Sequence, residues 1–184
     1  MKNDPVSYGI YIGEKILNAI KHCDSKQGEG RQSVQESAQK IGVVRRAVDF
    51  PSLMLSLGIK AAYVFYLSKS KVFEKGNQKK FYDIYQYIAS TEDNEGRYLN
   101  SICGELKREE GAGYIAYLAI LIKTIEEKAS SKANIGQQNN KDNYQGEPLA
   151  LLEKALSIAE GLDFRQQRVL SPYLVEIKTV LEAL

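Results

Sequence analysis

Residues 50–69 read FPSLMLSLGIKAAYVFYLSK, a stretch that is apolar around nearly its whole circumference when wound as a helix. Pro51 suits the first turn of a helix, where its missing N–H costs nothing, and Asp49 or Ser52 can cap the remaining amides. Only Lys60 interrupts the apolar surface, so neighbouring helices must enclose this one. The run is also shorter than the roughly 20 apolar residues that a membrane-spanning helix needs. It therefore predicts the buried central helix of an all-α protein.

Apolar residues at helical spacing predict further helices on both sides of this stretch. The chain of 184 residues fits a single helical domain, 1–184, built as a bundle of six to eight helices. Residues 114–125 are rich enough in β-branched side chains for a buried strand, but no second strand candidate exists to pair with them, so we expect a helix. The expected helices cover residues 6–22, 33–48, 50–69, 77–88, 98–106, 114–125, 148–161 and 163–184, the last with a kink or restart at Pro172.

Two details of this bundle follow from the same pattern. Because both apolar segments must be enclosed, we expect five side chains to be almost fully buried against one another: Leu53, Leu57, Val64, Leu118 and Ile122. Residues 130–146 are polar and hold almost no large apolar side chain, so they predict a mobile loop within the domain.

The composition excludes a strongly basic protein. Lysine and arginine number 25 against 23 acidic residues, a formal charge of +2, so any nucleic-acid-binding surface must be local. No export signal is evident, and we expect a cytoplasmic protein. Cys23 and Cys103 are far apart in sequence and have no Cys-x-x-Cys partner, which predicts ordinary thiols rather than a disulfide or a zinc site.

No motif predicts catalysis. His22 and Cys23 are adjacent, but neighbours on a helix point about 100° apart, too far for a nucleophile and its base. The paired glutamates at 109–110 and 126–127 fit solvated helix surfaces. Residues 111–113 (Gly-Ala-Gly) precede a helix without the rest of a phosphate-binding motif, and a flexible helix junction explains them better. We therefore expect a protein that is not an enzyme and that binds no cofactor or metal.

Residues 35–53 can also be compared with a helix-turn-helix, with Gly42 at the turn. The recognition helix would then have to run through Pro51, which removes a helical hydrogen bond. A DNA-binding helix-turn-helix is therefore a minority interpretation of this segment.

The most basic part of the chain is residues 69–80, which hold five lysines and one glutamate. Lysines bind phosphates, and tyrosines such as Tyr82, Tyr85 and Tyr87 can stack on unpaired bases. The alternative is a solvated segment whose lysines only keep the protein in solution. The candidate RNA-binding residues are Arg45, Arg46, Lys69, Lys71, Lys75, Lys79 and Lys80.

Residues 50–69 resemble the central helix of the small all-helical subunit of type III CRISPR RNA-guided effector complexes, most similar to the Cmr type. That helix reads proline, two residues, aliphatics, a glycine, then a small-aromatic-aliphatic run that ends in lysine. The chain departs from it at Leu57, where an asparagine often precedes the glycine. Residues 114–125 and 170–184 resemble later helices of the same family.

The resemblance implies a non-catalytic subunit of an antiviral ribonucleoprotein. It implies that copies stack on one another along the complex, beside the other subunits, and lie against the duplex of guide RNA and target RNA. The family has no catalytic motif and no fixed RNA-contacting signature, so the basic residues above rest on their own chemistry. The alternatives are a helical DNA-binding transcriptional regulator and a helical adaptor protein.

Overall fold

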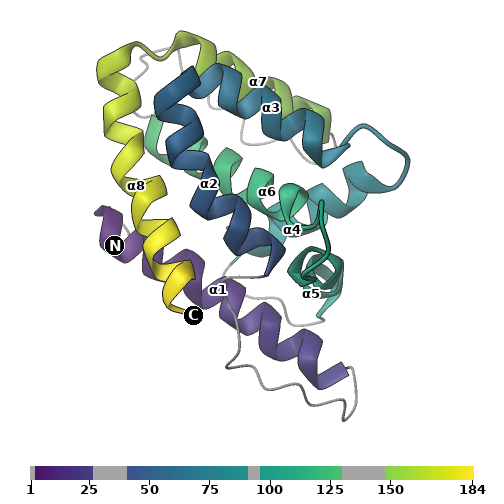
Figure 1. The fold of residues 1–184 in the computed structure, drawn as a ribbon. Coiled ribbons are helices and arrows are strands. Elements are labelled where there is room, and N and C mark those ends of the chain that lie inside the picture. The colour runs from purple at the N-terminus through teal and green to yellow at the C-terminus, as the bar shows by residue number, and fades with distance from the viewer. Residues whose placement is uncertain (1–2, 27–40, 91–95, 130–147) are drawn as a thin grey trace.

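A computed structural model of the protein describes residues 3–26, 41–90, 96–129 and 148–184, and these form one all-α bundle (Figure 1). The all-α fold expected from the sequence is therefore confirmed. The described part of the chain holds eight α-helices, a short 3-10 helix and one π-helical turn. In chain order they are α1 (Pro5–Lys26), α2 (Gly42–Leu57), α3 (Ile59–Ser70), α4 (Asn77–Ala89), α5 (Arg97–Ile102), η3 (Cys103–Leu106), α6 (Tyr114–Thr124), η4 (Ile125–Ala129), α7 (Pro148–Gly161) and α8 (Phe164–Ala183).

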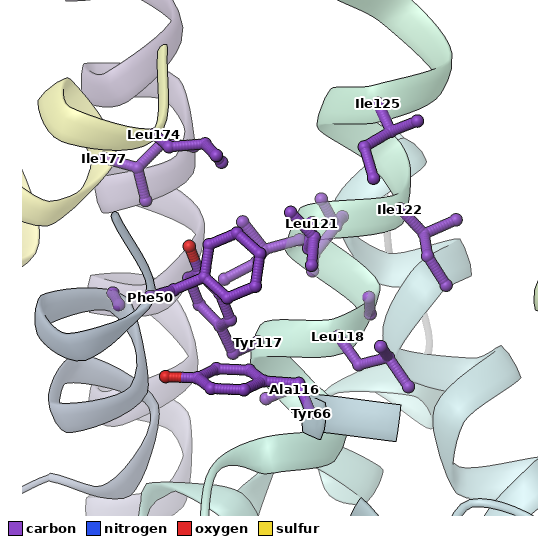
Figure 2. Packing of buried hydrophobic residues seen from close by; sticks show 14 of the residues in the cluster. Phe50, Tyr66, Ala116, Tyr117, Leu118, Leu121, Ile122, Ile125, Leu174 and Ile177 are labelled. Atoms are coloured by element: carbon purple, nitrogen blue, oxygen red, sulfur yellow. The ribbon is translucent and has the colours of Figure 1, made fainter. Parts of the chain in front are cut away.

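The central helix of the bundle is α6. Every side chain from Ile115 to Ile122 is buried, and α2, α3, α4, α7 and α8 all pack against the helix. Figure 2 shows residues of α6 meeting Phe50 of α2 and Leu174 of α8 in one apolar cluster. The helix predicted over residues 114–125 is thus confirmed, and it occupies the place that the sequence pattern assigned to residues 50–69.

Residues 50–69 do not form one buried helix, which corrects the prediction. The helix is interrupted at Gly58, where α2 ends and α3 starts on a new axis. Gly58 has a φ of 83°, a value that glycine adopts readily and that is costly for other residues. Leu57 is 54% exposed and Val64 is 42% exposed, whereas Leu118 and Ile122 are fully buried. The apolar face predicted for one continuous helix does not stay on the same side of the chain when the helix is interrupted. This is why Leu57 and Val64 were wrongly expected in the core.

The two prolines expected at helix starts or kinks lie inside helices. Pro51 is buried in the middle of α2, so neither Asp49 nor Ser52 caps a helix beside it. The first residue of α2 is Gly42, whose N–H donates to the carbonyl of Lys107 at 3.1 Å. Contact with the segment before α6 therefore positions the start of α2. In α8 the helix runs through Pro172 without a break, as α2 does at Pro51.

Two glycines allow α1 and α8 to approach closely. A Cβ added to Gly9 would lie 2.9 Å from the backbone carbonyl carbon of Glu176, and one added to Gly13 would lie 2.4 Å from a methyl carbon of Val180. The glycines are four residues apart and so share one face of α1. The two glycines therefore allow the first helix of the chain, α1, to pack closely against the last, α8.

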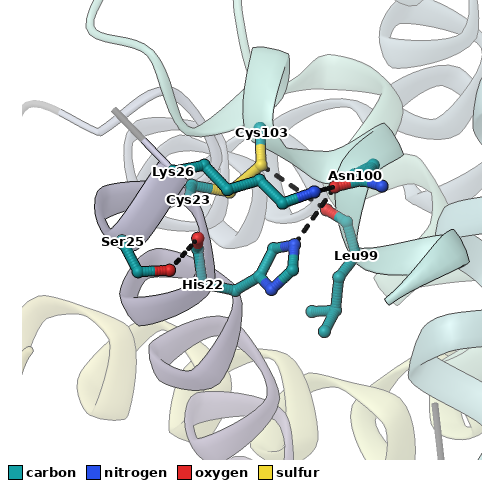
Figure 3. The surroundings of a disulfide bond; sticks show 7 residues. All are labelled: His22, Cys23, Ser25, Lys26, Leu99, Asn100 and Cys103. Atoms are coloured by element: carbon teal, nitrogen blue, oxygen red, sulfur yellow. Dashed lines mark hydrogen bonds between the residues drawn. A yellow bond between two sulfur atoms is a disulfide. The ribbon is translucent and has the colours of Figure 1, made fainter. Parts of the chain in front are cut away.

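Cys23 and Cys103 form a disulfide, which corrects the prediction of two ordinary thiols (Figure 3). Their Cα atoms are 5.6 Å apart although 80 positions separate them in the chain. Packing brings the end of α1 beside the start of η3, and His22 and Lys26 reinforce the contact by bonding the side-chain oxygen of Asn100 at 3.1 Å and 2.5 Å. Sequence spacing carries no information about such a long-range pair.

Some predictions fall outside this description. The loop predicted over residues 130–146 and the first part of the helix predicted over residues 33–48 lie outside the described residues. None of the helices described is long and apolar enough to cross a membrane.

Candidate nucleic-acid interface

A rigid turn, residues 71–76, joins α3 to α4 at the lysine-rich segment. Lys71 adopts the left-handed conformation with φ 52°, and its carbonyl accepts the side-chain amide of Asn77 at 2.9 Å. Val72 is fully buried and its N–H donates to the Ser70 hydroxyl. Asn77 is the first residue of α4 and its side chain braces the turn, while Gly76 occupies the cap position before the helix.

The turn and the ends of its two helices present four lysines to solvent: Lys69, Lys71, Lys75 and Lys79, hereafter the lysine face. No residue in the described ranges forms an ion pair with Lys69, Lys71 or Lys75. Lys79 pairs with Asp83 at 3.0 Å, yet its side chain stays 74% exposed. Four ammonium groups within eleven residues of chain make a local positive field in a protein near neutrality.

Lys80, one residue further on, serves the fold instead. Its ammonium lies 2.8 Å from a carboxylate oxygen of Glu105, and the side chains are 31% and 7% exposed. The other carboxylate oxygen accepts the N–H groups of Gly113 and Ile115 at the start of α6. Lys80 is therefore neutralised by a buried partner and is removed from the predicted RNA-binding set.

Arg46 is removed because it is buried and its guanidinium is bound within the fold. Only 8% of this residue is exposed, its guanidinium lies over the ring of Tyr114 at 4.1 Å, and it donates to the Tyr114 hydroxyl at 2.8 Å. Arg45 points outward from the first turns of α2. The Tyr66 hydroxyl donates to the Arg46 carbonyl at 2.8 Å, which places this part of α2 beside the end of α3, so Arg45 and the lysine face lie on adjacent helices.

A surface hollow of about 500 Å³ opens beside the lysine face. The turn contributes Phe73, α4 contributes Tyr82, and α7 contributes Pro148. The remaining lining comes from the residues Glu74, Lys75, Gly76, Gln78 and Lys79. Phe73 is 57% exposed, directly after the fully buried Val72. The lining thus combines two aromatic side chains with two lysines and one glutamate.

Of the three tyrosines proposed as stacking platforms, the structure leaves only Tyr82 at this surface. The Tyr85 hydroxyl donates to the Glu126 carboxylate at 2.6 Å. Burial is the main cause that raises the pKa of Tyr85, and the neighbouring Glu126 carboxylate raises it further. Tyr87 is 3% exposed and donates to the carbonyl of Lys15 at 2.5 Å. Sequence reasoning missed Phe73; the signal available was an aromatic residue between Lys71 and Lys75.

The glycines before α6 do not form a phosphate-binding loop. Glu105 already accepts the first amides of the helix, and a Cβ on Gly113 would lie 2.1 Å from the backbone of Gly42. Close packing of two backbones, rather than the expected flexibility, explains why glycine stands there. The helix-turn-helix interpretation of residues 35–53 lies partly outside the described residues, and α2 does run through Pro51.

Comparisons of the chain with protein-family models, with curated proteins and with solved structures found no match.

Proposed function

We propose that this protein is a non-catalytic, RNA-binding helical subunit that acts as the small subunit of a type III CRISPR effector complex in the cytoplasm. The observation that carries the proposal is the lysine face, because four exposed cations on one turn and the ends of its two helices suit the phosphates of a nucleic-acid backbone. The sequence resemblance of residues 50–69, which here belong to α2 and α3 rather than to one central helix, supplies the kind of complex. In it, the protein contacts guide RNA and target RNA, other subunits and copies of itself.

The modest number of cations bears on how the protein would bind. Arg45 and the lysine face offer five exposed charges, so an isolated copy binds RNA weakly. Copies aligned on one RNA add their contacts without any new chemistry, because each bound copy raises the effective concentration of the next. Weak single-site binding with stronger binding to long RNA is the expected behaviour of such a subunit.

Exposed apolar side chains support a role within a larger assembly. Leu55, Leu57 and Phe164 are 76%, 54% and 68% exposed. The N–H of Ile59 donates to the side-chain oxygen of Gln167 at 3.3 Å, which places the α2–α3 junction beside the start of α8. Exposed apolar groups gathered at one end of a bundle are typical of protein contacts.

The test compares binding of single-stranded RNA, guide–target RNA duplex and duplex DNA across a salt series. One variant carries glutamine at the four positions of the lysine face, and a matched control carries glutamine at Lys21, Lys154, Arg165 and Lys178 on α1, α7 and α8. Both variants lose four positive charges. The lysine-face variant should lower the slope of log affinity against log salt by about 3 for single-stranded RNA, at about 0.7 per phosphate contact, and the control should not.

Each other result has a definite meaning. Equal losses in the two variants would show that only total charge matters and would overturn the assigned surface. Sequence-selective binding of duplex DNA would favour a transcriptional regulator. A wild-type protein that binds none of the three nucleic acids would favour a helical adaptor.

A further inference from the structure

We propose that the hollow beside the lysine face binds one unpaired nucleotide, with its base stacked on Phe73 and its phosphate held by Lys75 and Lys79. The inference rests on the proposed function and makes it narrower: at this surface the protein would recognise single-stranded RNA or a nucleotide turned out of a duplex. Backbone contacts alone would not distinguish these from a continuous duplex.

The position of Phe73 supports a binding role because the turn holds it outward. The neighbouring Val72 is fully buried, and the N–H of Glu74 donates to the carbonyl of Lys71 at 3.0 Å. Asn77 fastens the same carbonyl. The backbone on both sides of Phe73 is therefore fixed, so the ring is presented to solvent at little further cost in conformational entropy.

The lining of the hollow matches the chemistry of a nucleotide. A base is a flat aromatic group that stacks favourably on a phenylalanine or tyrosine ring, whatever the identity of the base. Phe73 and Tyr82 provide such rings, and the same hollow is lined by Lys75 and by Lys79, whose ammonium pairs with Asp83 but whose side chain is 74% exposed. Glu74 lines the same hollow.

An apolar protein segment fits this hollow less well. If an apolar segment were bound on Phe73, it would remove the ammonium of Lys75 from water and give it no charged partner. No described residue forms an ion pair with Lys75. Removing a charge from water without a partner is costly. A phosphate-bearing aromatic ligand satisfies the ring and the cations together.

The experiment measures binding of a short single-stranded RNA that carries one fluorescent base analogue, and binding of a blunt RNA duplex. It uses wild type, Phe73→Leu and Phe73→Trp, with Phe164→Leu as the matched control because Phe164 is similarly exposed on α8. Phe73→Leu removes the stacking ring but keeps an apolar side chain and every charge. We expect Phe73→Leu to lower the affinity for single-stranded RNA at least fivefold and to leave the salt slope and the duplex affinity unchanged. Stacking on the ring should quench the fluorescence of the base analogue, and Phe73→Leu should abolish this quenching. Phe73→Trp should retain the single-strand affinity and the quenching.

The outcomes separate this inference from the proposed function. If Phe73→Leu binds single strands like wild type while the lysine-face variant does not, stacking is overturned and RNA binding stands. If wild type binds no RNA, both proposals fail. If Phe73→Leu alters only self-association in sedimentation, Phe73 is a protein contact and the inference is wrong. Circular dichroism melts of the three variants show whether each one is folded.

Discussion

Glu105 Oε2 lies 2.8 Å from the backbone nitrogen of Gly113 and accepts its N–H, so a buried carboxylate on η3 caps the central helix α6. The same carboxylate pairs with Lys80 of α4. Glu105→Ala should lower the free energy of unfolding by about 3–4 kcal/mol, because it leaves helix amides and an ammonium without their partner. Glu109→Ala, on an exposed residue of the same segment, should change it by less than about 0.5 kcal/mol. Equal values from urea denaturation would contradict this role.

The Cys23–Cys103 disulfide closes a loop of 80 positions and should be a major stabiliser. The chain-entropy account gives about 4.5 kcal/mol for a loop of this length. Denaturation of wild type with and without reductant should show this difference, and the double variant Cys23→Ser, Cys103→Ser should be insensitive to reductant. Two reactive thiols in the folded, unreduced protein would show that the bond is absent. Because cytosolic disulfides are rare outside hyperthermophiles, the state of these thiols in the native cell also tests the proposed location.

The rings of Tyr66 and Tyr117 both contact the Phe50 ring in the core, with centroids 5.0 Å and 5.5 Å away, yet their hydroxyls differ in hydrogen bonding (Figure 2). The Tyr66 hydroxyl donates to the Arg46 carbonyl, whereas the buried Tyr117 hydroxyl meets no hydrogen-bond partner among the described residues. Tyr66→Phe should therefore cost about 1 kcal/mol, and Tyr117→Phe should be neutral or stabilising by up to about 1 kcal/mol. If urea denaturation showed a larger loss of unfolding free energy for Tyr117→Phe than for Tyr66→Phe, the Tyr117 hydroxyl would have a hydrogen-bond partner and this interpretation would be wrong.

Gly9 and Gly13 should be intolerant of alanine although both lie inside α1. Alanine favours a helix by about 1 kcal/mol over glycine, but here its methyl group would meet α8. Gly9→Ala should be destabilising because its neighbour is backbone, and more so than Gly13→Ala, which meets a valine methyl that can shift. Gly161→Ala at the end of α7 is the control, since nothing lies near its added methyl. Thermal melts should rank Gly161→Ala as the most stable of the three.

Alkaline pH should unfold the protein through its buried tyrosines. Burial raises the pKa of Tyr8, Tyr63, Tyr66, Tyr85 and Tyr117 above the ordinary value of about 10. Above that pH the unfolded chain holds fewer protons than the folded one, so stability that is complete below about pH 10 is lost as pH rises. Phenolate absorbance should therefore rise together with the loss of helical circular dichroism. A phenolate signal from all twelve tyrosines in the still folded protein would contradict the burial.

Local pattern determined the helices of this protein. Residues 114–125 are apolar on every side, which forces enclosure wherever the helix lies, and the helix over residues 148–161 has the same ends in the structure as in the sequence pattern. The lysine face was visible for the same reason, because its four members are neighbours along the chain. Helical spacing needs only nearby residues, so the sequence carries it directly.

Tertiary packing decided which of two similar residues stays mostly exposed and which binds a partner distant in sequence. Lys79 and Lys80 are adjacent, yet only a helix 25 positions away, bearing Glu105, commits Lys80 to the fold. Cys23 meets Cys103 because α1 ends beside η3, and Leu57 faces solvent because one glycine turns the chain. Such outcomes depend on partners distant in sequence and on the direction that the chain takes after each break, which local periodicity does not encode.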